Sequence, residues 1–184
     1  YGADSANSIK ADGGVIFELE CDGEVVAYSS ESTPARVMNE YKNGYKKSLT
    51  PQLGYSFLFD ATKCGEMKPG LWHKSCATGR KVKLSPRPVK KCVVSAPVFS
   101  EEIKQENGVY LFDLKKEYSG QTYLDFYSET EQKILISYGE HIKNGGVARI
   151  VGNRDFSFEY IAKRGENKYV NPFRRLGLRY IEVK

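Results

Sequence analysis

The feature that most constrains this chain is a series of short runs, between residues 109 and 184, in which apolar and polar residues alternate. Successive side chains of a β-strand point to opposite faces, so alternation in β-branched and aromatic residues indicates strands that are buried on one side. Three runs each gather apolar residues on one face: Leu124 and Phe126; Ile134, Ile136 and Tyr138; and Phe156, Phe158 and Tyr160. The second half is therefore predicted to be a sheet.

The closing run alternates in the same way and is predicted to be a central strand. It sets Leu178, Tyr180 and Glu182 against Arg179, Ile181 and Val183. The charged residues 100–107 are expected to form a loop, and residues 115–120 are expected to turn the chain.

The first half carries a hairpin signal. Asp22-Gly23 separates the alternating residues 14–21 from Glu24–Tyr28. An Asp-Gly pair favours a type I′ turn, because that turn needs positive φ at both central residues. Tyr55–Asp60 is predicted to be a further strand, and Ala35–Lys47 is a candidate short helix that Asn43-Gly44 would stop.

Short strands without a long helical pattern between them are typical of sandwiches and jelly rolls. We predict an all-β chain of two β-sandwich or jelly-roll-like modules, with at most one or two short helices. Short strands are also expected at residues 81–84 and 92–95. Ser85–Pro88 is the linker candidate, because its two prolines cannot continue a ladder. The modules are then residues 1–90, a partial jelly roll, and residues 91–184, a β-sandwich.

The charge balance argues against nucleic acid as a partner. The net charge is +5, from 28 basic and 23 acidic residues that are interleaved along the chain. The basic residues between Arg80 and Lys91 are interpreted as a solvated linker, with a strip for polyanions as the alternative. No apolar run approaches the roughly 18 residues of a membrane span, so no membrane partner is predicted. The start at Tyr1, without Met, suggests a processed or excised piece.

Four cysteines stand at positions 21, 64, 76 and 92, without a CxxC pair. Unpaired thiols are the expectation, and no cofactor or metal is predicted. Two alternatives stay open: a disulfide between Cys64 and Cys76, and a zinc site made by Cys64, His73, Cys76 and Cys92.

The second half resembles a known family in three motifs that occur in order. Tyr110–Gly120, Ile136–Glu140 and Phe173–Val183 resemble the opening, a middle "YGE" strand and the closing strand of a β-sandwich found in bacterial α-L-rhamnosidases of glycoside hydrolase family 78. More weakly, three stretches resemble the end of the carbohydrate-binding-like jelly roll that comes earlier in such enzymes, including its pattern of a strand, an FDAR motif and a Trp: Gly14–Ser30, Tyr55–Lys63 and Trp72–Ala77. Thr62-Lys63 departs from that pattern, where Arg is common.

The resemblance implies a non-catalytic part of a larger enzyme. In the family, an inverting hydrolysis is carried out by an (α/α)6 barrel that follows the sandwiches, and this chain shows no such helical region. Whether the chain is itself an enzyme is left open. The implied partners are the barrel of the parent chain and rhamnose-containing plant or microbial glycans, and the implied location is periplasmic or extracellular. A free-standing carbohydrate-binding module is the alternative.

No catalytic residue is predicted. Glu140, Asp155 and Glu159 are the carboxylates considered, but sequence cannot place two of them across one glycosidic bond.

Seven residues are candidates for binding. Sugar rings stack on aromatic side chains and bond to fixed polar groups, which makes Trp72, Asn153, Arg154 and Asp155 candidates for carbohydrate binding. The competing interpretation of Trp72 is packing in the core or between domains. For the other three residues it is a turn stabilised by Asn and Asp side chains. Arg175, Arg179 and Tyr180, near the closing strand, are candidates for interdomain contact. Bracing of the barrel is favoured over sugar binding.

Overall fold

The computed structural model of the chain describes residues 14–50, 54–65, 69–79, 83–91, 93–100, 102–171 and 176–184. It divides into two compact units, one of Tyr1–Met38 with Glu66–Ser95 and one of Asn39–Gly65 with Ala96–Lys184. The helical content of the described residues is two single 3-10 turns, η1 (Ala61–Lys63) and η2 (Pro69–Leu71). The all-β prediction is confirmed. The predicted module boundary near residue 90 stays a prediction.

The first unit contains two small antiparallel ladders. β1 (Glu18–Cys21) pairs with β2 (Glu24–Tyr28), and β3 (Pro34–Arg36) pairs with β6 (Trp72–Lys74). At the predicted hairpin turn, φ is 52° at Asp22 and 84° at Gly23, which confirms the Asp-Gly prediction.

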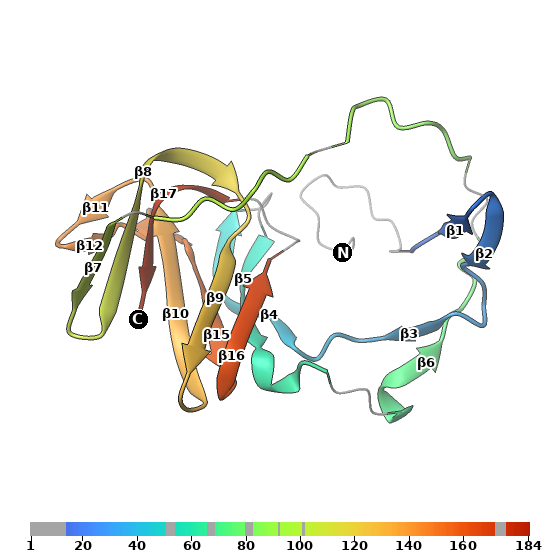
Figure 1. Ribbon diagram of the computed structural model, residues 1–184, viewed down its shortest axis with the longest axis horizontal. Helices are drawn as coiled ribbons and strands as arrows, with labels where there is room; N and C mark the ends of the chain where they lie inside the picture. The colour runs from blue at the N-terminus through green and yellow to red at the C-terminus, as the bar shows by residue number, and fades with distance from the viewer. Residues whose placement is uncertain are drawn as a thin grey trace. The chain divides into compact units, whose positions relative to one another are not determined.

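The second unit is organised around a seven-stranded sheet in the order β4-β5-β15-β10-β17-β8-β7 (Figure 1). Neighbouring strands are antiparallel except β5 and β15, which are parallel. The strands are β4 (Tyr41–Thr50), β5 (Gly54–Asp60), β7 (Glu102–Glu106), β8 (Val109–Gly120), β10 (Gln132–Gly139), β15 (Ser157–Ala162) and β17 (Leu176–Val183).

A two-stranded sheet covers one face of the large sheet and makes the unit a sandwich. It consists of β9 (Tyr123–Ser128) and β16 (Gly165–Val170), which Figure 1 shows side by side. Two small hairpins complete the unit: β11 (Ile142–Lys143) with β12 (Gly146–Val147), and β13 (Ile150–Val151) with β14 (Arg154–Asp155).

Aromatic side chains fill the space between the two sheets. Tyr169 of β16 reaches Phe59 of β5, with ring centroids 4.3 Å apart, and Phe126 of β9 meets Tyr160 of β15 edge to face at 5.8 Å. The alternating runs of the sequence supply this core as predicted, since the buried cluster comprises Phe57, Phe59, Ala61, Ile136, Tyr138, Phe158, Tyr160, Ala162, Tyr169, Leu176 and Leu178.

The candidate helix at Ala35–Lys47 is wrong, because this stretch contributes to β3 and β4. Asn43 and Gly44 are poor helix formers, and pairing of β4 with β5 outweighs the weak helical spacing of Val37, Met38 and Tyr41. Val37 is 72% exposed, so that spacing does not mark a buried helix face.

The predicted loop at residues 100–107 is also wrong. Residues 102–106 form β7, which pairs with β8 across Asn107 and Gly108. These two residues have φ of 49° and 77°, so Asn107-Gly108 is a second hairpin signal that the sequence reasoning missed. Two other short strands were predicted, at residues 81–84 and 92–95. The described residues of these stretches, 83–84 and 93–95, do not form strands. Residues 81, 82 and 92 lie outside the described part.

The predicted turn at residues 115–120 is a bulge within β8. Lys115 has a φ of 67°, and its N–H donates to Asp113 Oδ1 at 2.7 Å. The ladder between β8 and β17 shifts register between Leu178 and Tyr180. The faces predicted for the closing run are therefore wrong: Leu178 packs in the core together with Ile181 and Val183.

The cysteines that the structure describes form no disulfide: Cys21, Cys64 and Cys76 are all exposed, and the alternative bridge between Cys64 and Cys76 is absent. Cys92 lies outside the described residues. Within the described part of the chain, no helix is long and apolar enough to cross a membrane.

Candidate functional site

Trp72 belongs to the first unit, where it begins β6 and is half-buried. The guanidinium of Arg36, its partner in the β3–β6 ladder, lies 5.9 Å from the centroid of the Trp72 ring. A cation over one ring face leaves the ring with less surface for a sugar. Its role as a ligand platform stays a prediction.

Residues 152–155 form the turn and second strand of the β13–β14 hairpin. Gly152 has a φ of 61°, while Asn153 and Arg154 are exposed. Asp155 is engaged by its own domain, because Arg149 Nη1 lies 3.1 Å from Oδ1 and 3.2 Å from Oδ2. Ser157 Oγ also donates to Asp155 Oδ1 at 2.7 Å.

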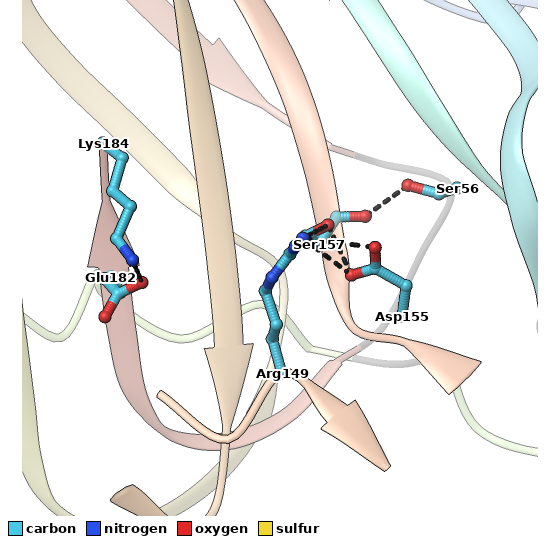
Figure 2. Close-up of polar contacts among 6 residues, drawn as sticks. All are labelled: Ser56, Arg149, Asp155, Ser157, Glu182 and Lys184. Carbon is cyan, nitrogen blue, oxygen red and sulfur yellow. Dashed lines mark hydrogen bonds and ion pairs between the residues drawn. The ribbon is translucent and has the colours of Figure 1, made fainter. Parts of the chain in front are cut away.

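Figure 2 shows this cluster and how it is tied to the neighbouring strand. Arg149 Nη1 also donates to Ser157 Oγ at 3.2 Å, and Ser56 Oγ of β5 donates to the carbonyl oxygen of Ser157. The acceptors that the sequence offered to a sugar are thus used to fix the start of β15. The cluster joins structural partners, and the predicted role of Asn153, Arg154 and Asp155 in carbohydrate binding stays a prediction.

Two of the residues predicted for interdomain contact, Arg179 and Tyr180, lie on β17. They stand beside the carboxylate of Asp113 on β8. Arg179 meets Asp113 through two parallel hydrogen bonds, with Nε 2.9 Å from Oδ1 and Nη2 3.0 Å from Oδ2. Such bidentate pairs fix both side chains in one plane. The guanidinium also lies 4.8 Å from the centroid of the Tyr180 ring. Arg175 lies outside the described residues.

This ion pair sets the charge state of the site. The hydrogen bond from Arg179 is the main cause that lowers the pKa of Asp113 to about 2, although partial burial opposes it. The backbone N–H of Lys115, held in the bulge, lowers the pKa of Asp113 further. The same hydrogen bond raises the pKa of Arg179. At neutral pH the site therefore presents a carboxylate that accepts and a guanidinium that donates.

A groove adjoins the ion pair, which we call the outer-face groove. It has a volume of about 390 Å³ and is lined by Lys104, Leu111, Asp113, Ile142, Gly145 and Tyr180. Its residues come from β7, β8 and β17 of the large sheet and from the β11–β12 hairpin. Asp113 and Tyr180 are partners in the β8–β17 ladder, so the shift in register at the bulge brings the carboxylate and the ring together.

Besides Asp113, Glu182 is a residue of this region that was missed as a candidate. Glu182 is 3% exposed, and its Oε2 accepts the backbone N–H of Val147 at 3.1 Å. Glu182 Oε1 also forms an ion pair with Lys184, whose Nζ lies 2.8 Å away. Figure 2 shows this pair. Glu182 thereby anchors the β11–β12 hairpin, one wall of the outer-face groove. The signal in the sequence was a carboxylate in the alternating closing run, where Glu182 shares a predicted face with Leu178 and Tyr180.

The three carboxylates considered for catalysis lie in different surroundings. Asp155 is paired with Arg149, and Lys133 Nζ lies 2.7 Å from Glu159 Oε2, while Glu140 is exposed. A general acid of a glycosidase needs a raised pKa, and the pKa of Asp113 is lowered. The described residues contain no group of three His, Cys, Asp or Glu side chains placed to hold a metal ion.

Comparison with known proteins gives one family and one solved structure. Residues 103–184 match the family described as the bacterial alpha-L-rhamnosidase concanavalin-like domain. The crystal structure of a glycoside hydrolase family 78 rhamnosidase from Bacillus sp. GL1 is 26% identical, with a TM-score of 0.36. The match covers 41% of this chain and 8% of that chain. No curated protein matches. Residues 103–184 are therefore similar to the concanavalin-like domain of the bacterial α-L-rhamnosidases.

Proposed function

We propose that the second unit is a non-catalytic β-sandwich domain of an α-L-rhamnosidase-related glycoside hydrolase, where it braces an (α/α)6 catalytic barrel of the same polypeptide. The match of residues 103–184 supports the family context. The pairing of Asp113, Asp155 and Glu159 with basic side chains of their own domain supports a structural role, because each carboxylate is already held by a neighbouring residue.

The outer-face groove is the observation that carries this proposal. Interfaces between protein domains are enriched in Tyr and Arg, and side chains already held in place lose little entropy on docking. Tyr180 and Arg179 meet both conditions, since the two hydrogen bonds to Asp113 fix the guanidinium against the ring. Ile142, 39% exposed, adds apolar surface at the rim of the groove.

The first test concerns the gene. Reading the coding region beyond the codon for Lys184 is expected to reveal a frame that encodes the helices of an (α/α)6 barrel. A stop codon directly after Lys184 would contradict the proposed bracing role.

The second test uses the complete polypeptide from that gene. Tyr180→Ala is expected to lower the melting temperature of the barrel, because a side chain that docks on the barrel is lost. Tyr127→Ala is the matched control, since Tyr127 is 68% exposed and lies on β9 of the other sheet. Equal effects of the two substitutions on the barrel would count against docking at the groove.

Contact with a glycan is a second candidate, favoured by the same groove. Tyr180 offers an aromatic ring. Asp113 already accepts hydrogen bonds from Arg179 and Lys115, but a carboxylate has about four acceptor positions, so its Oδ2 can still accept from a sugar hydroxyl group. Titration of the chain with L-rhamnose, followed by NMR, is expected to shift Tyr180 and Ile142 resonances saturably. The Tyr180→Ala variant is expected to lose the response. A flat titration of the unaltered chain refutes the glycan site and leaves docking on the barrel standing.

The proposal also implies that the chain alone does not hydrolyse an aryl α-L-rhamnoside above the uncatalysed rate. Release of rhamnose that depends on the concentration of the chain, and survives purification over several columns, would overturn the non-catalytic assignment.

A further inference from the structure

Strands β4 and β5 lie outside the region that matches the family, yet they belong to the sheet of that domain. β5 pairs in parallel with β15, with Leu58 opposite Glu159, Phe59 opposite Tyr160 and Asp60 opposite Ile161. β4 extends the sheet by pairing with β5. The matched residues begin at 103, more than forty residues after β5 ends. The sheet is therefore built from two separated stretches of the chain.

The side chains of β5 are core residues of the sandwich. Phe57 and Phe59 are 5% and 7% exposed. Phe57 stacks on Phe158 with centroids 4.9 Å apart and planes inclined by 14°, and Phe59 stacks on Tyr160 at 5.5 Å. Leu58, on the other face of β5, is also buried. A strand that is buried on both faces contributes more to a core than an edge strand with one solvent-exposed face.

Polar contacts fix the register of this segment. Ser56 Oγ donates to the carbonyl oxygen of Ser157 at the start of the parallel pair, as Figure 2 shows. After β5, Asp60 Oδ1 accepts the N–H of Thr62 at 3.1 Å and so caps η1, which places Ala61 in the core with 4% exposure. A slip by one residue would break these bonds and would turn Phe57 and Phe59 away from the second sheet.

The sandwich domain is discontinuous, composed of residues 39–65 and 96–184. We propose that the edge of β15, together with the apolar space between the sheets, is a strand-acceptor surface that holds the segment 39–65 of the same chain without needing the covalent connection between the two stretches. The segment between residues 65 and 96 is a covalent tether that the fold of the sandwich does not require. This inference does not depend on the proposed bracing role.

The test cuts the tether in the complete chain. A recognition site for a sequence-specific protease is inserted between Val89 and Lys90, both exposed, and the folded protein is cleaved there. The two pieces are expected to elute as one particle in size-exclusion chromatography and to separate only in denaturant. Pieces that separate in native buffer refute the proposal.

Two variants identify the contact that holds the pieces together. Phe57→Asp places a charge in the core and is expected to make the cleaved pieces separate, whereas Val26→Asp on β2, 58% exposed, is expected to leave them together. Cleaved pieces of the Phe57→Asp variant that still elute together would show that the association does not depend on β5, and the proposal would fail.

Amide hydrogen exchange on the uncleaved, unaltered chain gives a readout free of mutation. The exchange rates of the amides of residues 56–60 are expected to agree with those of β15 within about tenfold, because strands of one cooperative unit open together. Exchange of β5 on the order of a hundredfold faster than that of β15 contradicts a donor role for the segment.

Discussion

Replacement of Phe59 by Ala tests how much the aromatic core contributes to stability. Phe59 is 7% exposed, and its ring lies 4.3 Å from that of Tyr169, 4.9 Å from that of Tyr41 and 5.5 Å from that of Tyr160. Aromatic side chains bury roughly 150–250 Å². At about 25 cal/mol per Å², the low end of that range corresponds to about 4 kcal/mol of transfer free energy.

Two further effects nearly cancel. Alanine keeps a little of the buried area, while the cavity and the lost ring contacts add to the cost, so that buried Phe→Ala changes cost about 3–5 kcal/mol. We therefore expect Phe59→Ala to lower the free energy of unfolding of the second unit by about 3–4 kcal/mol. Phe99→Ala is the matched control. Phe99 is 69% exposed and touches Tyr123 edge to face, so its loss is expected to cost about 1 kcal/mol.

The assay is guanidinium-induced unfolding followed by near-ultraviolet circular dichroism, which reports on the packed tyrosine rings of the second unit. The fluorescence of Trp72 reports on the first unit separately, because this single tryptophan lies in β6. Equal losses for Phe59→Ala and Phe99→Ala, or a loss below about 1 kcal/mol for Phe59→Ala, would contradict the assignment of β5 to the core.

Three further predictions concern single groups. The pKa of Asp113 is lowered to about 2, so its pairing with Arg179 contributes to stability fully above pH 3.8 and is lost as the pH falls toward 2. NMR titration of the carboxyl carbon of Asp113 should show this midpoint, and Arg179→Gln should move the midpoint toward 3.8. Burial raises the pKa of Tyr160 to about 12, so stability should fall as the pH rises from 10 to 12, and denaturation of the Tyr160→Phe variant across that range should show a smaller fall. A Cβ on Gly146 would clash with Glu182 Oε2, so Gly146→Ala should destabilise the domain by about 1–3 kcal/mol in thermal unfolding and shift the NMR resonances of the β11–β12 hairpin.

The sequence allowed the strands of the sandwich to be predicted where side-chain alternation reports on burial. The faces of β10 and β15 follow from Ile136, Tyr138, Phe158 and Tyr160, because one buried face dictates an apolar residue at every second position. The face of β17 was predicted wrongly, because a bulge adds residues on β8, and the pattern of β17 alone does not record the partner strand.

Long-range pairing was beyond the reach of a local pattern. Tyr55–Asp60 was recognised as a strand, but nothing in these six residues says which sheet they join. At the candidate site, Arg179 and Tyr180 were singled out from the closing strand, whereas Asp113 was missed. A bidentate partner 66 positions away in the sequence leaves no trace in the spacing of either residue.

The parallel pairing of β5 with β15 has a consequence for synthesis on the ribosome. Phe59 emerges about a hundred residues before Tyr160, and at about 5–20 residues per second the wait lasts roughly 5–20 seconds. During that interval an apolar strand is complete while its partner does not yet exist. Such a nascent segment is a natural client for chaperones, and slower elongation would lengthen the time in which it can aggregate. The yield of soluble protein should therefore depend on translation speed between β5 and β15 more than on translation speed after β15.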